Sequence, residues 1–96
     1  LKCYGYLIYL KDGRLIWYSG DCNKVSNVIN EYSIDEIYHD TCLDDYDGNV
    51  HTPLRVLCKS IPKEKRSKVY CMHIDSNELI KKAGLEGFNV VDISIN

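Results

Sequence analysis

Three strand-like runs in this chain of 96 residues each end in polar residues that can bind a metal ion or move a proton. The first run ends in Asp21, the second in His39-Asp40 and the third in His73. In α/β proteins the carboxyl ends of the strands lie at one edge of the sheet, and ligands bind there. The pattern therefore predicts an α/β fold in which these residues, far apart in sequence, meet at one site.

The size and composition of the chain limit the classes of protein that it can belong to. Residues 1–96 are expected to form a single domain with a modest core. The formal charge of −2 argues against binding nucleic acid through a basic surface, although it is compatible with a phosphate substrate. No apolar run approaches the roughly 20 residues that span a bilayer, so no contact with a membrane is expected.

The cysteines indicate the compartment. Five cysteines is an odd number, their spacing is irregular, and there is no Cys-x-x-Cys pair. A disulfide framework is therefore not expected, and a reducing, cytoplasmic location fits better. Cys58 and Cys71 lie in apolar runs and are expected to be small core residues.

Hydrophobic periodicity gives the expected order of elements. Asp12-Gly13 separates two apolar runs and predicts a β-hairpin, because both turn residues tolerate a positive φ. Downstream, apolar stripes at helical spacing alternate with short apolar runs. The predicted order is a β-hairpin followed by α-β-α-β-α-β with parallel crossovers. The expected helices lie near residues 25–32, 54–61 and 75–84, and the expected strands near 34–39, 69–74 and 88–95.

Local signals predict where two of these helices begin. Thr52 followed by Pro53 is typical of a hydroxyl cap with proline at the first helical position. Asp75 with Glu78 three residues later resembles a capping box. The intervening run 63–68 is charged and is expected to be a solvated connector.

Asp21 and His73 are the candidate metal ligands. The carboxylate of Asp21 has two oxygens and could bridge two metal ions, although it could equally cap the helix that follows. His73 ends an apolar strand and carries a common metal-binding group, although a histidine at such a position is also common in a core.

His51, Asp40 and His39 are the candidate catalytic residues. His51 precedes a predicted helix start, where its ring could contact a phosphate or move a proton. Asp40 could orient His51 or act as its acid–base partner, and His39 is an equally placed alternative. Taken singly, each of these residues is also common in loops and turns that have no catalytic role. An acidic run at 44–48 lacks the full spacing of a calcium loop and is expected to be solvated.

Taken in order, four short motifs resemble a known family. They are Gly20-Asp21-Cys22, His39-Asp40-Thr41, His51-Thr52 and Cys71-Met72-His73. This set is similar to the C-terminal half of the metallo-β-lactamase fold, and closest to its ribonuclease Z-like phosphodiesterase branch. The implied fold is half of an αββα sandwich, and the N-terminal half, which supplies the His-x-His-x-Asp-His motif, is absent from the sequence.

The resemblance implies a function as well as a fold. It implies a metal-dependent hydrolase that acts on a phosphodiester or nucleic acid with two zinc ions, or manganese. Asp21 would bridge the metals, His73 would hold one of them, and His51 oriented by Asp40 would assist the leaving group. The implied partner is the missing half or a second copy of the chain, and the chain alone would be inactive or weakly active. The alternative is a non-catalytic half-fold that binds a partner or oligomerises.

Overall fold

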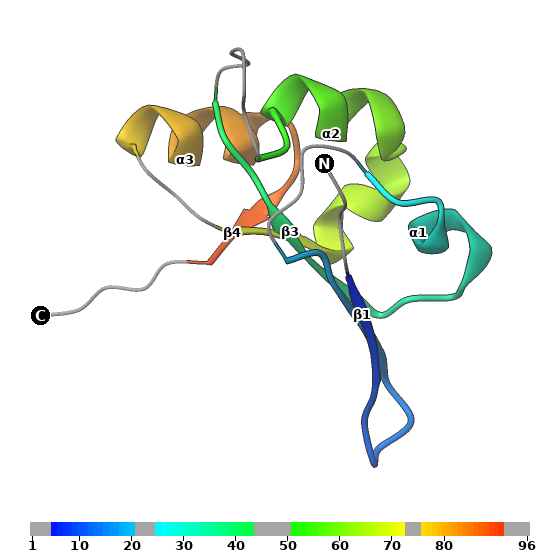
Figure 1. The fold of residues 1–96 in the computed structure, drawn as a ribbon. Coiled ribbons are helices and arrows are strands. Elements are labelled where there is room, and N and C mark those ends of the chain that lie inside the picture. The colour runs from blue at the N-terminus through cyan, green and yellow to red at the C-terminus, as the bar shows by residue number, and fades with distance from the viewer. Residues whose placement is uncertain (1–4, 21–24, 44–50, 73–75, 92–96) are drawn as a thin grey trace, which may run out of the picture.

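The computed structural model describes residues 5–20, 25–43, 51–72 and 76–91. They form one mixed sheet with the strand order β1-β2-β3-β4-β5, accompanied by helices (Figure 1). The strands are β1 (Tyr6–Tyr9), β2 (Leu15–Tyr18), β3 (Glu36–Asp40), β4 (Val69–Met72) and β5 (Asn89–Val90). The helices are α1 (Val28–Glu31), α2 (Leu54–Ser60), α3 (Asn77–Leu85) and the 3-10 helix η1 (Lys63–Lys68). None of the described helices is long and apolar enough to cross a membrane.

The predicted hairpin is confirmed. Strands β1 and β2 pair antiparallel, and the N–H of Gly13 donates to the carbonyl of Leu10 at 3.0 Å. Gly13 has a φ of +91°, a conformation that a residue with a Cβ adopts only under strain. The N–H of Arg14 donates to the Asp12 carboxylate at 3.0 Å. The Asp-Gly pair therefore closes the turn through both a side-chain bond and a backbone conformation.

The three α-helices lie on the same side of the sheet (Figure 1). Strands β2 to β5 pair parallel and follow one another in both sequence and space. Each parallel connection contains a helix, and such connections are almost always right-handed. A run of right-handed crossovers in one direction places every helix on one face. The parallel strand predicted near residues 69–74 is found as β4 over Val69–Met72, paired with β3 on one side and β5 on the other, while residues 73–75 lie outside the described ones.

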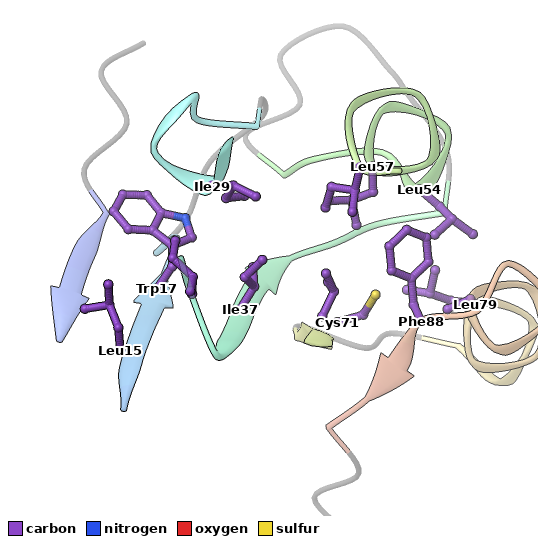
Figure 2. Close-up of a cluster of buried hydrophobic side chains, with 13 residues drawn as sticks. Leu15, Trp17, Ile29, Ile37, Leu54, Leu57, Cys71, Leu79 and Phe88 are labelled. Carbon is purple, nitrogen blue, oxygen red and sulfur yellow. The ribbon is translucent and has the colours of Figure 1, made fainter. Parts of the chain in front are cut away.

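The core fills the space between the sheet and these helices (Figure 2). Trp17 of β2, Ile37 of β3 and Cys71 of β4 point toward the helices. Side chains alternate between the two faces along each strand, so the neighbours of these residues point the other way. Ile29 of α1 and Leu57 of α2 pack from above onto the three side chains that point toward the helices, and Leu57 is fully buried. The prediction that Cys71 is a core residue is confirmed, whereas Cys58 is only partly buried.

Helix starts are shifted from the predicted positions. Pro53, rather than Thr52, occupies the N-cap of α2, and no side chain caps that helix. At α3 the cap is Ser76, whose Oγ accepts a hydrogen bond from the N–H of Leu79 at 3.2 Å. Asp75 lies outside the described residues. At α3 the cap lies one residue later than expected because serine and aspartate are both favoured at the N-cap, whereas at α2 the expected hydroxyl cap does not form.

The charged run 63–68 is exposed at most positions, as expected of a solvated connector, but it is helical and one of its side chains is buried. It forms η1, and Arg66 within it is buried to 6% exposure. The Arg66 guanidinium donates to the carbonyls of Cys58, Ile61 and Glu86 at 2.7, 3.1 and 2.9 Å. These carbonyls lie at the ends of α2 and α3, where helices leave acceptors unsatisfied. Arg66 therefore ties the two helix ends together.

The predicted fold class, half of an αββα metallo-β-lactamase sandwich, is corrected by this architecture. The described residues form a small compact unit, with a Cα radius of gyration of 12.9 Å and one five-stranded mixed sheet. This arrangement is only weakly compatible with half of such a sandwich. Periodicity and turn signals specified individual elements, but the same elements can be part of many larger folds.

Candidate functional site

The carboxyl end of β3 holds Asp40 in a fixed position. Asp40 is the last residue of the strand, is 2% exposed, and donates its backbone N–H to the Oγ of Ser19 at 2.8 Å. Ser19 follows β2 and is itself buried, and its hydroxyl donates to the carbonyl of Gly20 at 2.8 Å. This hydrogen-bonded link between neighbouring strand ends restricts the backbone that carries the Asp40 carboxylate.

Ser19 was not singled out from the sequence as part of the site. The available signal was its place directly after an apolar run and before Gly20. A hydroxyl there can bond to the adjacent strand end when the next strand is parallel. That pairing is known only from the fold.

His51 is brought beside Asp40 by a short parallel bridge. The N–H of Cys42 donates to the carbonyl of Thr52 at 2.9 Å, and the N–H of Leu54 donates back to Cys42 at 2.8 Å. The segment that enters α2 therefore runs alongside the segment that leaves β3. This pairing places His51 next to a carboxylate 11 positions earlier in the sequence.

The imidazole of His51 and the carboxylate of Asp40 form a hydrogen bond of 2.6 Å between Nδ1 and Oδ2. Because a carboxylate oxygen accepts, Nδ1 carries the proton and donates it. In a neutral ring Nε2 then has the lone pair and can accept a proton or a hydrogen bond. The Asp40 side chain is 2% exposed and that of His51 is 16% exposed, so solvent can reach the imidazole but scarcely the carboxylate.

His39 is placed differently, although it adjoins Asp40 in sequence. It is fully buried on the helix-covered side of β3, in register with Cys71 of β4. Its Nδ1 donates to the backbone carbonyl of Asp40 at 2.9 Å, and its buried Nε2 has no hydrogen-bond partner. Burial lowers the pKa of His39, with a smaller opposing effect from Asp40. The structure thus separates the two histidines that the sequence left as equal alternatives: His51 is accessible and His39 is in the core.

The predicted metal ligands, Asp21 and His73, lie outside the described residues. Among the described residues there is no group of three or more His, Cys, Asp or Glu side chains that could hold a metal ion. The described residues therefore do not fit a metal centre, and no step of the chemistry below depends on one. Zinc or manganese at Asp21 and His73 stays a prediction.

The fold and this pair define a small α/β protein with a buried carboxylate and an accessible imidazole at the carboxyl edge of a mixed sheet. A family comparison then identifies the group. The sequence matches the family described as Anti-Pycsar protein Apyc1 over residues 1–91, and the chain belongs to that family. Among curated proteins no sequence matches the chain.

The family match corrects the expectations drawn from the resemblance. The matching family is described as Anti-Pycsar protein Apyc1. It is not a metallo-β-lactamase family, so the predicted membership of the ribonuclease Z-like branch is wrong. The metal-dependent phosphodiesterase fragment and its alternative, a non-catalytic half-fold, are therefore replaced by membership of the Apyc1 family. The zinc-hydrolase description also lacks support, since the described part of the chain contains no metal-binding group. Short motifs of two or three residues do not discriminate between families whose elements follow in the same order.

Proposed function

We propose that this chain acts against Pycsar, as the description of its family states for Apyc1, and that His51 and Asp40 form the site through which it acts. This function relates the protein to anti-phage defence. The observation that carries the site assignment is the 2.6 Å hydrogen bond between the accessible His51 and the buried Asp40.

The chemistry of the pair is proton transfer. Asp40 holds the Nδ1 proton of His51 and fixes the orientation of the ring. Nε2 can then take a proton from a bound molecule and return it, which is general acid–base catalysis.

A cytoplasmic location is part of this proposal. Cys42, Cys58 and Cys71 are free thiols in the structure. Free thiols in several parts of a small domain are typical of a reducing compartment.

A phage-plating assay tests the proposal. Bacteria that resist phage through Pycsar would express the wild-type chain, His51→Ala, Asp40→Asn or the control Lys59→Ala on the exposed surface of α2. We expect the wild type and Lys59→Ala to restore plaques, and the two site variants to lose on the order of 100-fold or more of that effect, the usual contribution of a general acid–base group. Folding of each variant is checked by the fluorescence of Trp17, the one tryptophan in the sequence.

Two results would overturn the proposal. If the wild-type chain leaves plaque counts unchanged, the function is wrong. If folded His51→Ala and Asp40→Asn restore plaques as well as the wild type, the function stands but the site is wrong.

A further inference from the structure

A groove of about 490 Å³ lies between α2 and α3, which cover the same face of the sheet (Figure 1). That volume is within the range of pockets that bind small molecules. The walls are two stripes of residues, one from each helix: Leu54, Arg55 and Cys58 from α2, and Lys82, Leu85 and Glu86 from α3. Residues three and four positions apart lie on one face of a helix, so each stripe faces the groove as a unit. Neither His51 nor Asp40 lines this groove.

Part of the groove is apolar. Leu43, three residues beyond the end of β3, lines it together with Leu54, Cys58 and Leu85. Leu85 is 87% exposed and Leu43 is only partly buried. A single exposed leucine is ordinary, but these two line the same groove beside a buried one. A ligand with an apolar body would therefore cover apolar surface that folding leaves in contact with water.

The groove also has a cation on each wall. Arg55 and Lys82 both line it and both are exposed. Lys82 pairs with Glu78 at 3.1 Å, but both side chains are more than half exposed, and such a pair is weak in water. Glu86 contributes a carboxylate, which accepts from the buried Arg66 guanidinium at 3.3 Å, so its charge is offset within the protein. The charges that line the groove therefore favour an anion.

We propose that the groove between α2 and α3 binds a small amphipathic anion, namely a carboxylate or sulfonate with an apolar tail. The anionic head would lie between Arg55 and Lys82, and the tail would pack on Leu54 and Leu85. A free inorganic anion would make only exposed ion pairs, which contribute little in water.

A helix of a partner protein fits this groove less well than a small molecule. Grooves that bind an amphipathic helix contact it over several successive turns, through residues at i, i+3, i+4 and i+7. The described lining covers only residues 54–58 of α2 and 82–86 of α3, which is little more than one turn of each. The length of the groove therefore suits a ligand with a short tail.

Decanoate, kept below its micelle concentration, is the probe, and a ¹H–¹⁵N NMR titration of the whole chain measures where and how tightly it binds. We expect saturable shifts of the amide signals of Leu54, Cys58 and Leu85. Acetate has the head without the tail, and decyltrimethylammonium has the tail with the opposite charge. Both should bind about tenfold more weakly than decanoate or not at all.

Three variants test the two parts of the groove. Lys82→Glu reverses the charge on the α3 wall and should weaken decanoate binding roughly three- to tenfold. Its matched control, Lys81→Glu, makes the same charge change at an exposed position of α3 that is not among the lining residues, and should bind as the wild type does. Leu85→Ser removes apolar surface from the groove at an exposed position and should also weaken binding while the fold is kept.

The reactivity of Cys58 gives a second readout, because its side chain lines the groove. Saturating decanoate should slow the reaction of Cys58 with a thiol reagent in the wild type, and less so in Lys82→Glu. The proposal is wrong if decanoate gives no saturable shifts, or shifts only signals away from the two helices. It is also wrong if decyltrimethylammonium binds as tightly as decanoate, or if Lys82→Glu binds decanoate as tightly as Lys81→Glu, because the groove would then not select an anion.

Discussion

Asp40 contacts two imidazoles through different atoms, and the difference separates their roles. Its carboxylate accepts from His51, whereas its backbone carbonyl accepts from His39. Both bonds place the proton on Nδ1 and the lone pair on Nε2. For His51 that nitrogen belongs to a side chain that solvent reaches, while for His39 it is buried without a hydrogen-bond partner. The same tautomer therefore suits His51 for proton transfer and makes His39 sensitive to protonation.

Stability should fall in mild acid because of His39. Burial lowers the pKa of His39 below its ordinary value near 6.5, so the unfolded chain binds the proton at a higher pH than the folded one. The contribution of the neutral His39 ring to the free energy of unfolding is complete above pH 6.5. It is lost as the pH falls from that value toward the pKa of His39 in the folded state. The free energy of unfolding in urea, followed by Trp17 fluorescence, should therefore be lower at pH 5.5 than at pH 7.5.

His39→Asn provides the comparison for this pH dependence. The amide can still donate to the carbonyl of Asp40 but does not titrate between these pH values. We expect the variant to lose less stability than the wild type between pH 7.5 and 5.5. An equal loss in both proteins would show that other groups cause the acid sensitivity.

Gly5 is a position where any side chain would disturb the core. A Cβ built there would overlap ring atoms of Trp17, which lies in the core beside β1. Gly5→Ala is therefore expected to lower the free energy of unfolding by about 1–3 kcal/mol, as overpacking does. The matched control is Gly84→Ala in α3, where the new Cβ would meet nothing within 4 Å. That change should stabilise the protein by about 0.5–1 kcal/mol, and a destabilisation by Gly5→Ala no larger than 0.5 kcal/mol would contradict the packing described here.

Arg66 shows how one side chain can join several elements. Its guanidinium bonds to carbonyls at the ends of α2 and α3, and it lies 5.2 Å from the ring centroid of Phe88, just before β5. Helix ends leave carbonyls unsatisfied, and a planar group with five donors can serve several of them at once. The last turns of both helices depend on this residue.

Replacement of Arg66 should destabilise the protein substantially. Arg66→Met leaves buried carbonyls of Cys58 and Ile61 without their donor, and we expect a loss of about 3 kcal/mol in the free energy of unfolding. Lys68→Met removes an exposed charge from the same 3-10 helix and should change stability by less than about 0.5 kcal/mol. Equal effects of the two changes in urea unfolding would show that the buried hydrogen bonds contribute little.

The elements could be predicted from the sequence where a short-range signal was sufficient. Asp12-Gly13 closes the hairpin by local chemistry, and the apolar run from Val69 gave a parallel inner strand. The burial of Arg66 could not be predicted, because its partners lie five to twenty positions away and belong to helix ends. Charged residues such as Lys65 and Lys68 are typical of an exposed segment, so the whole run 63–68 was expected to be solvated.

The candidate site was predictable in its residues but not in its geometry or its family. The proximity of His51 to Asp40 depends on the bridge between Cys42 and Pro53, and no local pattern specifies that pairing. The wrong assignment to a metallo-β-lactamase half came from short motifs in a plausible order. The family match covers residues 1–91 and therefore uses the residue type at nearly every position of the chain. A few motifs of two or three residues do not contain that information.

The rate at which the cysteines react tests whether the domain opens only as a whole or also locally. Burial raises the pKa of Cys71 to about 11, and the thiolate is the reactive form. At pH 8 Cys71 should react with a thiol reagent only when the domain opens, whereas the partly exposed Cys58 should react sooner. Peptide mapping by mass spectrometry after timed labelling measures both rates. Native-state labelling of Cys71 as fast as that of Cys58 would show that the sheet opens locally.

The most direct test of the account is the tautomer of His51, measured by long-range ¹H–¹⁵N correlation NMR on the neutral ring. The structure predicts protonated Nδ1 and unprotonated Nε2 in the wild type, because Asp40 accepts from Nδ1 at 2.6 Å. Asp40→Asn should remove this preference while the Nδ1-protonated signal of His39 persists, since His39 donates to a backbone carbonyl. A wild-type His51 protonated at Nε2, or a tautomer unchanged by Asp40→Asn, would contradict the proposed proton-transfer site.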